Sequence, residues 1–309
     1  MNPLYINTPL IPSRPLSQHL GKEVLLKMEL LQPSGSFKNR GIGHYCLKAA
    51  RDGIRNFVSA SGGNAGLAVA YSGRELGIPV TVVIPETTPS FMKAKITAEG
   101  AEVIVHGKNL NEATLFAQKL VEEKSGLFIS PYDHPAIWDG HASIVHEIAR
   151  TGKKPGAIIL SVGGGGLLCG VVQGLHEVGW KDVPVITVET EGAASFAASI
   201  REDRLVTLDS ISTVATSLGL RRVTDQAFHY SKTHAIHPFV VSDKEAVDAA
   251  FRFMDEQKYM LEPACAVCLV PIYKKEPLLQ QFSSIHVILC GGNVVTLELL
   301  QKWKNEPLT

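Results

Sequence analysis

The sequence lacks several features that mark particular classes of protein. No apolar run reaches the length of about 18 residues that a membrane-spanning helix needs. An excess of positive charge is also missing, because 30 Lys and Arg residues balance 30 Asp and Glu residues. Proteins that bind nucleic acids or anionic membranes commonly carry such an excess. We therefore expect neither a nucleic acid nor a membrane as a partner.

Cysteine is scarce and odd in number. The five cysteines are Cys46, Cys169, Cys265, Cys268 and Cys290. Residues 1–13 show no basic segment followed by an apolar one, as a secretory signal would. An odd number of cysteines without a signal is typical of reduced thiols, so we expect a cytoplasmic location. Cys265 and Cys268 have the spacing of a redox motif, but their apolar surroundings favour a pair of core cysteines.

The composition and the order of the predicted elements indicate a globular α/β protein. The chain is 45% hydrophobic and 19% charged, which is typical of a protein with a large core. Strand-like runs alternate with helix-like runs almost throughout, as in parallel α/β sheets. We predict two three-layer α/β/α domains with mostly parallel sheets. The smaller domain, residues 37–135, would be inserted into a larger one made of residues 1–36 and 136–309.

The stretch from Gln32 to Gly41 is the first candidate for a functional site. It follows a predicted strand over residues 23–30 and precedes a predicted helix over residues 37–51, with Ser36 as the expected N-cap. Lys38 then lies in the first helical turn, where the helix dipole disfavours a cation. A lysine at such a position is more useful as a neutral amine, the nucleophile of Schiff-base chemistry. The alternative is an exposed lysine without a catalytic role.

Two further stretches place glycine between a strand and a helix. In Ser61–Gly66, backbone N–H groups and the Ser61 hydroxyl can bind a carboxylate at the helix N-terminus. In Gly163–Gly166, four consecutive glycines form a set of N–H donors suited to one phosphate group. This second stretch has neither the Lys-Ser/Thr of a Walker loop nor the spacing of a dinucleotide site. A tight strand-to-helix turn, which glycine also favours, is the alternative for the first stretch.

The third glycine stretch, residues 290–293, follows the last predicted strand and begins with Cys290. It has the same alternative, a tight turn with a buried thiol. Since ligands bind at the carboxyl ends of strands in open α/β sheets, all three stretches are candidates for one site. An imine-forming lysine, a phosphate site and a carboxylate site together indicate pyridoxal 5′-phosphate acting on an amino acid.

These motifs resemble those of a known family. Ser34-Gly35-Ser36-Phe37-Lys38, Ser61-Gly62-Gly63-Asn64-Ala65-Gly66, Gly163-Gly164-Gly165-Gly166-Leu167 and Cys290-Gly291-Gly292 occur in the order found in fold-type II, or tryptophan synthase β-like, pyridoxal phosphate enzymes. Residues 138–143 and 262–265 also match the L-serine dehydratase/L-threonine deaminase group, so the resemblance covers nearly the whole chain. It implies that the cofactor lies in the cleft between the two domains.

The resemblance also implies a role for each matching residue. Lys38 would form the Schiff base, with Phe37 against one face of the cofactor ring and Ser217 near the other. Asn64 would hydrogen-bond the phenolic oxygen of the cofactor, and Cys290 would face the pyridine nitrogen. The residues expected to bind the cofactor phosphate are Gly163, Gly164, Gly165, Gly166 and Leu167. Those expected to bind the substrate carboxylate are Ser61, Gly62, Gly63, Asn64 and Ala65.

A monovalent cation is a further expectation from the resemblance. In related mammalian-type enzymes such a cation lies beside the phosphate loop. The matching positions are Gly163, Glu189, Ala193, Ser195, Leu218 and Leu220. Carbonyl oxygens and one carboxylate would suit a hard cation such as K⁺.

The activity that the resemblance implies is β-elimination from L-serine and L-threonine. Lys38 would remove the α-proton, and the products would be pyruvate or 2-oxobutyrate plus ammonia. Two positions favour elimination over related reactions. A thiol at Cys290 leaves the pyridine nitrogen unprotonated, whereas a carboxylate would protonate it. Gly62 lacks the hydroxyl that serine racemases carry at this position.

Other functions remain open on the sequence alone. A β-replacement enzyme such as a cysteine synthase is one, although those typically have Asp where this chain has Asn39. A serine racemase is another, and a catalytically dead sensor is a third, which retention of Lys38 argues against. Metal binding by Asp133, His134 and His141 is a weaker possibility. We expect a small amino-acid substrate and a homodimer.

Overall fold

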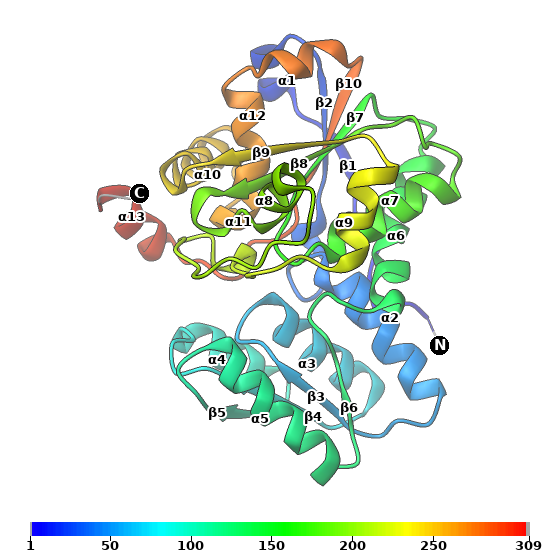
Figure 1. Cartoon of the computed structure of the whole chain (residues 1–309), viewed down its shortest axis with the longest axis vertical. Coiled ribbons are helices and arrows are strands. Elements are labelled where there is room, and N and C mark those ends of the chain that lie inside the picture. The colour runs from blue at the N-terminus through cyan, green and yellow to red at the C-terminus, as the bar shows by residue number, and fades with distance from the viewer. Residues whose placement is uncertain (1, 307–309) are drawn as a thin grey trace. The chain divides into compact units, whose positions relative to one another are not determined.

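The computed structural model describes residues 2–306, and the chain forms two compact units (Figure 1). Unit 1 contains Gln32–His141 together with the N-terminal segment through Ile6, and unit 2 contains Asn7–Leu31 and the chain from Ala142 onward. Within residues 2–306, no helix is both long and apolar enough to cross a membrane. The smaller domain expected from the sequence, residues 37–135, lies within the main segment of unit 1.

Unit 1 is built on a four-stranded parallel sheet. Its strands are β3 (Phe57–Ala60), β4 (Val80–Ile84), β5 (Glu102–Val105) and β6 (Leu127–Phe128), in the order β5-β4-β3-β6. Its helices are α2 (Lys38–Arg51), α3 (Asn64–Leu76), α4 (Ser90–Ala98) and α5 (Leu110–Glu123). Each strand is followed by a helix, and this connection produces parallel neighbours.

The core of unit 1 follows from the residues that these elements bury. Helices α3 and α5 both pack on β3 and β4, and α3 also packs on α2. Strands β3 and β4 are buried along their whole length, so they consist mainly of apolar residues without alternation. One fully buried cluster joins the sheet to α5. Its members are Val58, Ala60, Val83, Ala113, Ala117 and Leu120.

Unit 2 is built on a six-stranded sheet in the order β1-β2-β10-β7-β8-β9. The strands are β1 (Leu10–Pro12), β2 (Glu23–Lys27), β7 (Ala157–Ser161), β8 (Val185–Thr190), β9 (Ile236–Val241) and β10 (Ser284–Ile288). All neighbours are parallel except β1, which pairs antiparallel with β2. The predicted α/β class with mostly parallel sheets is confirmed.

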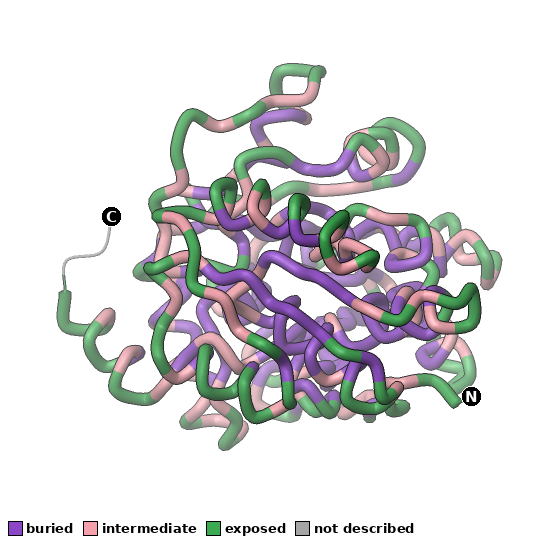
Figure 2. The backbone as a smooth tube through the Cα atoms, turned by 90° about the horizontal axis from the view of Figure 1, so that it is seen from below, coloured by how far each residue is buried: buried purple, intermediate pink, exposed green. Residues whose placement is uncertain are grey.

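Helices of several lengths surround the sheet of unit 2. They are α1 (Arg14–Leu20), α7 (Gly166–Glu177), α8 (Ser195–Glu202), α9 (Asp225–Thr233), α10 (Asp243–Gln257), α11 (Pro263–Ala266), α12 (Val270–Tyr273) and α13 (Leu297–Asn305). Helix α6 (Pro135–Arg150) begins in unit 1 and ends in unit 2. Figure 2 shows the buried residues as purple stretches in the interior, with exposed residues in green at the outer turns.

Two local predictions differ from the structure. The first strand ends at Lys27, because residues 29–31 form a 3₁₀ turn, η1. Residues 263–273 form α11, the 3₁₀ turn η4 (Val267–Leu269) and α12, which has a proline in its first turn. Ser36 is not the N-cap of α2. Phe37 occupies that position with helical backbone angles and makes no capping hydrogen bond.

A buried ionic group connects β2 to α6 in unit 2. The Lys27 ammonium lies 2.5 Å from a Glu147 carboxylate oxygen and donates to the Thr8 carbonyl at 2.6 Å. The Thr8 hydroxyl donates to Glu29, whose carboxylate is 3.9 Å from Lys27. All four residues are buried, so water cannot replace a lost partner.

We therefore expect Glu147→Ala to destabilise the protein strongly. Removing one partner leaves a buried charge uncompensated, which commonly costs about 3–5 kcal/mol. Urea denaturation of the purified protein would measure the loss. The matched control is Asp182→Ala, which removes an exposed ion pair with Lys154 and should change the midpoint little. Equal midpoint shifts for the two variants would contradict the prediction.

Candidate active site

Lys38 is the first residue of α2 and so lies in the first helical turn, where the sequence predicts it. Its amine donates a hydrogen bond to the Pro131 carbonyl at 2.5 Å and lies 5.0 Å from the centre of the Phe37 ring. Pro131 follows β6, so its loop reaches the lysine from the carboxyl end of the sheet. A carbonyl accepts from a neutral amine as well as from an ammonium, which suits a nucleophile that must lose its proton.

Asn39, the next residue, uses both ends of its side-chain amide. Its oxygen accepts from the Ser34 N–H at 2.9 Å, and its nitrogen donates to the Leu4 carbonyl. The two backbone partners fix the orientation of the amide, because one is a donor and the other an acceptor. An ionised aspartate could not donate to the Leu4 carbonyl, so these two hydrogen bonds together need asparagine at position 39.

His141 lies beneath the first turn of α2. Its ring is 4.8 Å from the Phe37 ring, and a Cβ added at Gly41 would lie 2.6 Å from its Cε1 atom. Burial, followed by the charges of Lys38 and Arg40, holds the pKa of His141 well below its ordinary value. The imidazole is therefore neutral. Among residues 2–306 neither ring nitrogen has a hydrogen-bond partner.

The loop between β3 and α3 contains the predicted carboxylate-binding residues. The Ser61 hydroxyl accepts from the Gly63 N–H at 3.3 Å, and a Cβ at Gly66 would lie only 1.9 Å from the Ser61 carbonyl oxygen. Gly66 is therefore required for the tight turn. Gly63 is the N-cap of α3 and has no side chain to cap it. Within the described chain, no hydrogen bond is found for the N–H of Gly62 or Ala65.

The four-glycine stretch lies between β7 and α7 in unit 2. The Gly164 carbonyl accepts from Thr224, and the Gly165 carbonyl accepts from Cys169. None of the hydrogen bonds found among residues 2–306 uses the N–H of Gly163 to Gly166. Four adjacent donors without an acceptor fit a phosphate group, since buried backbone donors are rarely left unpaired.

Close packing also explains why two of these residues are glycine. Gly165 has φ +90°, and a Cβ there would lie 2.6 Å from Cβ of Ala227. A Cβ at Gly163 would lie 3.1 Å from the Ser217 carbonyl oxygen and from Cα of Leu218. The predicted phosphate loop and the predicted Ser217 region are therefore in contact.

Cys290 follows β10, the neighbour of β7 in the sheet. Its sulfur lies 3.5 Å from the Ser161 hydroxyl, at the end of the strand that leads to the glycines. Burial and the neighbouring Cys290 raise the pKa of the Cys265 thiol well above its ordinary value. All five cysteines are free and buried, which confirms Cys265 and Cys268 as core residues.

Two groups of contacts in unit 2 involve predicted cation positions. The Glu189 carboxylate accepts from the N–H groups of Phe196 and Ala197 at 2.9 and 2.8 Å, at the start of α8. Burial raises the pKa of Glu189 to about 8, although these two hydrogen bonds lower it. Gly163 and Leu218 form the second group through the contact described above. No cluster of three or more His, Cys, Asp or Glu side chains suited to a metal occurs in residues 2–306.

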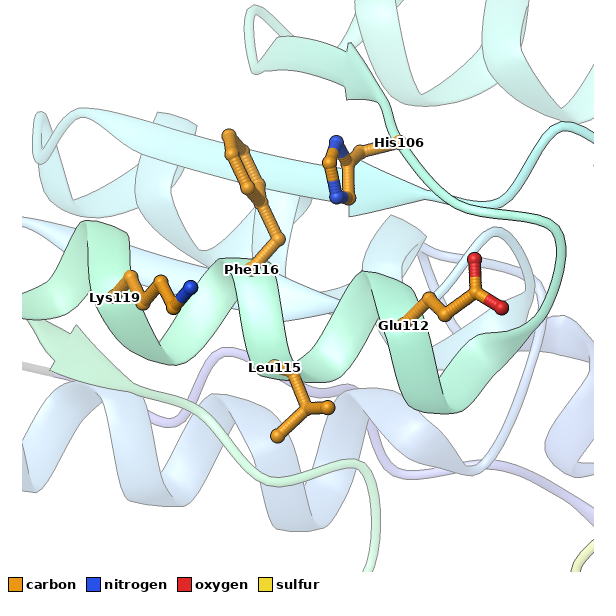
Figure 3. A pocket seen from close by; sticks show the side chains of 5 residues that line it. All are labelled: His106, Glu112, Leu115, Phe116 and Lys119. Carbon is orange, nitrogen blue, oxygen red and sulfur yellow. The ribbon is translucent and has the colours of Figure 1, made fainter.

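A pocket elsewhere in unit 1 contains none of the predicted site residues. It has a volume of about 270 Å³ and lies beside α5 (Figure 3). Its lining residues are His106, Glu112, Leu115, Phe116 and Lys119. The His106 and Phe116 rings stack at 4.0 Å, so the two aromatic lining residues pack against each other.

Comparison with known proteins identifies the family. A model of the family described as "Pyridoxal-phosphate dependent enzyme" matches residues 1–291. The chain belongs to this family. The mouse L-serine dehydratase/L-threonine deaminase is 50% identical, over 97% of this chain and 95% of that protein. Membership implies pyridoxal phosphate as the cofactor, which the unpaired donors of the glycine loop fit.

Two solved structures of the same fold are also similar. A fungal L-serine ammonia-lyase from Rhizomucor miehei has a TM-score of 0.94 and 38% identity, covering 98% of this chain and 99% of that one. A maize serine racemase has a TM-score of 0.90 and 25% identity, covering 97% and 92%. The fold type inferred from the motifs is therefore confirmed.

We expect Gly165→Ala to weaken cofactor binding and lower stability. The added methyl group would meet Ala227 and force a left-handed backbone on a non-glycine residue, which costs about 1–3 kcal/mol. Thermal unfolding and fluorescence titration with pyridoxal phosphate would measure both effects. The matched control is Gly179→Ala, because Gly179 has φ +77° but no atom within 4 Å of the added Cβ. Cofactor affinity should fall only in the first variant, and equal affinities would contradict the assignment.

Proposed function

We propose that the protein is a pyridoxal-phosphate-dependent dehydratase that converts L-serine and L-threonine to pyruvate and 2-oxobutyrate with release of ammonia. The observation that carries the proposal is Lys38 in the first turn of α2, with its amine held by a backbone carbonyl. The name of the mouse relative, at 50% identity over nearly the whole chain, supports the same substrates. The fungal L-serine ammonia-lyase supports the serine reaction.

Unit 1 would supply the groups that act on the substrate. The amine of Lys38, in its neutral form, would remove the α-proton. The loop from Ser61 to Ala65 would orient the substrate carboxylate through backbone N–H groups at the start of α3. Asn64 would hydrogen-bond the phenolic oxygen of the cofactor, and the Phe37 ring would lie against the cofactor ring.

Unit 2 would supply the groups that hold the cofactor. The N–H groups of Gly163 to Leu167 would bind its phosphate, with the dipole of α7 adding to the attraction. Cys290 would face the pyridine nitrogen with a thiol in place of a carboxylate, and the Ser217 region would cover the ring. When bound, pyridoxal phosphate supplies an electron sink for the carbanion formed at the α-carbon.

Two observations separate elimination from the related reactions. Both the donor and the acceptor of the Asn39 amide are hydrogen-bonded. An ionised aspartate, the residue typical of cysteine synthases, could not make the bond in which Asn39 is the donor. Gly62 has no side chain that could protonate the substrate, although the fold is shared with a maize serine racemase. Both observations favour a dehydratase over a β-replacement enzyme or a racemase.

Keto-acid release would test the proposed function. Purified protein with pyridoxal phosphate should release keto acid and ammonia from L-serine and L-threonine. O-acetylserine with sulfide should give little cysteine, and chiral chromatography should find little D-serine. Dominant cysteine synthesis or abundant D-serine would show that one of the alternatives is correct.

We predict that Lys38→Ala abolishes keto-acid release without unfolding the protein. Loss of a residue that is both nucleophile and base should reduce turnover by at least about 10⁴-fold. The visible absorbance of the bound cofactor should also become insensitive to borohydride. Lys48→Ala is the matched control, because Lys48 is an exposed lysine of the same helix. Near-parental turnover in Lys38→Ala would exclude the assignment.

We further propose that a monovalent cation such as K⁺ binds at Gly163, Glu189, Ala193, Ser195, Leu218 and Leu220. The buried Glu189 carboxylate supports this, because a cation would offset the cost of burying its negative charge. The Ser195 hydroxyl, buried and without a partner among residues 2–306, supplies a further oxygen at the start of α8.

This proposal predicts that the K⁺ requirement depends on pH. Without a cation the pKa of Glu189 is about 8, so at pH 7 the carboxyl is mostly protonated and a cation must displace the proton. The K⁺ affinity should therefore rise as pH increases from 6.5 to 8.5. Stimulation by KCl, measured against tetramethylammonium chloride at each pH, would show this. In Glu189→Gln the pH dependence should disappear, and its persistence would exclude Glu189 as the ligand.

The remaining proposals concern the location and the assembly of the protein. Five free, buried cysteines are suited to a reducing compartment, which supports a cytoplasmic enzyme. We also propose a homodimer, which sedimentation equilibrium would test. The domains proposed from the sequence are residues 37–135 and residues 1–36 with 136–309.

A further inference from the structure

The side chain of Thr88 lies directly over Gly62 in the predicted substrate loop. A Cβ built at Gly62 would lie 2.3 Å from the Thr88 hydroxyl oxygen, 2.5 Å from its methyl carbon and 3.0 Å from its Cβ. The backbone of Gly62 is not in the left-handed region, so the conformation itself does not require glycine. Glycine fits here because Thr88 fills the space that a side chain would occupy.

The order of the strands explains this contact. Strands β3 and β4 are parallel neighbours, with Ala60 paired to Val83. The loops after the two strands therefore leave the sheet at the same edge. The loop after β4 turns back at once, because the Thr88 N–H donates to the Pro85 carbonyl at 3.0 Å. This turn brings the Thr88 side chain onto the loop that follows β3.

The Thr88 hydroxyl is available to a ligand. Its side chain is half-buried, and no hydrogen bond of its hydroxyl is found in residues 2–306. The loop beneath it carries the N–H groups of Gly62 and Ala65, for which no acceptor is found in the same part of the chain. A hydroxyl and backbone N–H groups are the donors that proteins use to bind carboxylates.

We propose that Thr88 is a substrate-binding residue whose hydroxyl donates to the carboxylate held by residues 61–65. Its side chain also fixes the position of this loop by packing on Gly62. The inference rests on the proposed function, because it takes the ligand of the loop to be the carboxylate of an amino acid. It adds a residue from a second loop to the predicted substrate site.

The first experiment separates the hydroxyl from the packing. Thr88→Val keeps the shape but removes the donor, so KM for L-serine should rise about 10-fold while kcat changes by less than about twofold. Thr88→Ser restores the hydroxyl and should return KM to within about threefold of the parent. Thr87→Val is the matched control, since Thr87 is the exposed neighbour and should leave KM unchanged. An unchanged KM in Thr88→Val, or no recovery in Thr88→Ser, would overturn the binding role.

The second experiment needs neither cofactor nor activity. In the apoprotein, Gly62→Ala should lower the unfolding midpoint because the methyl group collides with Thr88. Thr88→Gly removes the side chain that the new methyl group meets. The double variant should therefore regain at least half of the decrease in unfolding midpoint caused by Gly62→Ala. This coupling is expected for residues in direct contact. Additive effects of the two substitutions would overturn the packing role.

The two experiments also distinguish this inference from the proposed function. If the parent protein released no keto acid, the proposed function would fail. The double-mutant cycle of Gly62 and Thr88 in the apoprotein would still decide whether Thr88 fixes the position of the loop at residues 61–65. If the parent were active and the Thr88 variants behaved like Thr87→Val, only the inference about Thr88 would fail.

Discussion

Every helix begins with backbone N–H groups that need an acceptor, and the helices of this protein differ in whether a side chain provides it. Helices α1, α5, α9, α10 and α13 are each capped by a side-chain oxygen, and the capping residues are Ser13, Asn109, Thr224, Ser242 and Thr296. Helices α3 and α7 instead begin after glycines with no side chain to cap them. Their donors remain available for a carboxylate and a phosphate.

The parallel arrangement of the strands determines where these donors lie. The loops that follow parallel strands leave a sheet at one edge, so residues distant in sequence become neighbours. In unit 1 this brings Thr88 onto Gly62, and in unit 2 it brings Cys290 to Ser161. Glycine is needed where one of these loops touches another element too closely for a side chain. The glycines of this protein therefore serve two purposes, since they both expose backbone donors and permit close packing.

The sequence predicted the fold class well because the signals are local. Buried parallel strands appear as continuous apolar runs, and the glycine stretches follow them directly, as with residues 157–166. Ser36 was wrong as an N-cap because Phe37 already has helical backbone angles, and the Ser36 hydroxyl is buried without a partner among residues 2–306. Such a conformation depends on packing around Phe37, which composition does not reveal.

Thr88 was missed as a site residue, and His141 was considered only as a metal ligand, for a different reason. Their positions depend on contacts between elements, with Gly62 for Thr88 and with Gly41 for His141. Thr88 follows the β-branched run at residues 80–84, so it lies at the edge of the sheet where ligands are expected. For His141 the sequence supplied a motif match over residues 138–143, but its place beneath α2 follows from a helix crossing that two glycines permit. Gly140 provides the second close approach, where a Cβ would lie 2.6 Å from Cα of Gly41.

The electrostatics around the lysine follow from the same helix crossing. Because Gly41 lets α6 approach, the His141 ring is buried beside Lys38 and Arg40, and protonating it would place a third cation there. The imidazole must therefore stay neutral, and it contributes shape rather than charge to the support of Phe37. A neutral ring adds no positive charge beside the amine, so the close approach at Gly41 links helix packing to the surroundings of the group proposed as the base.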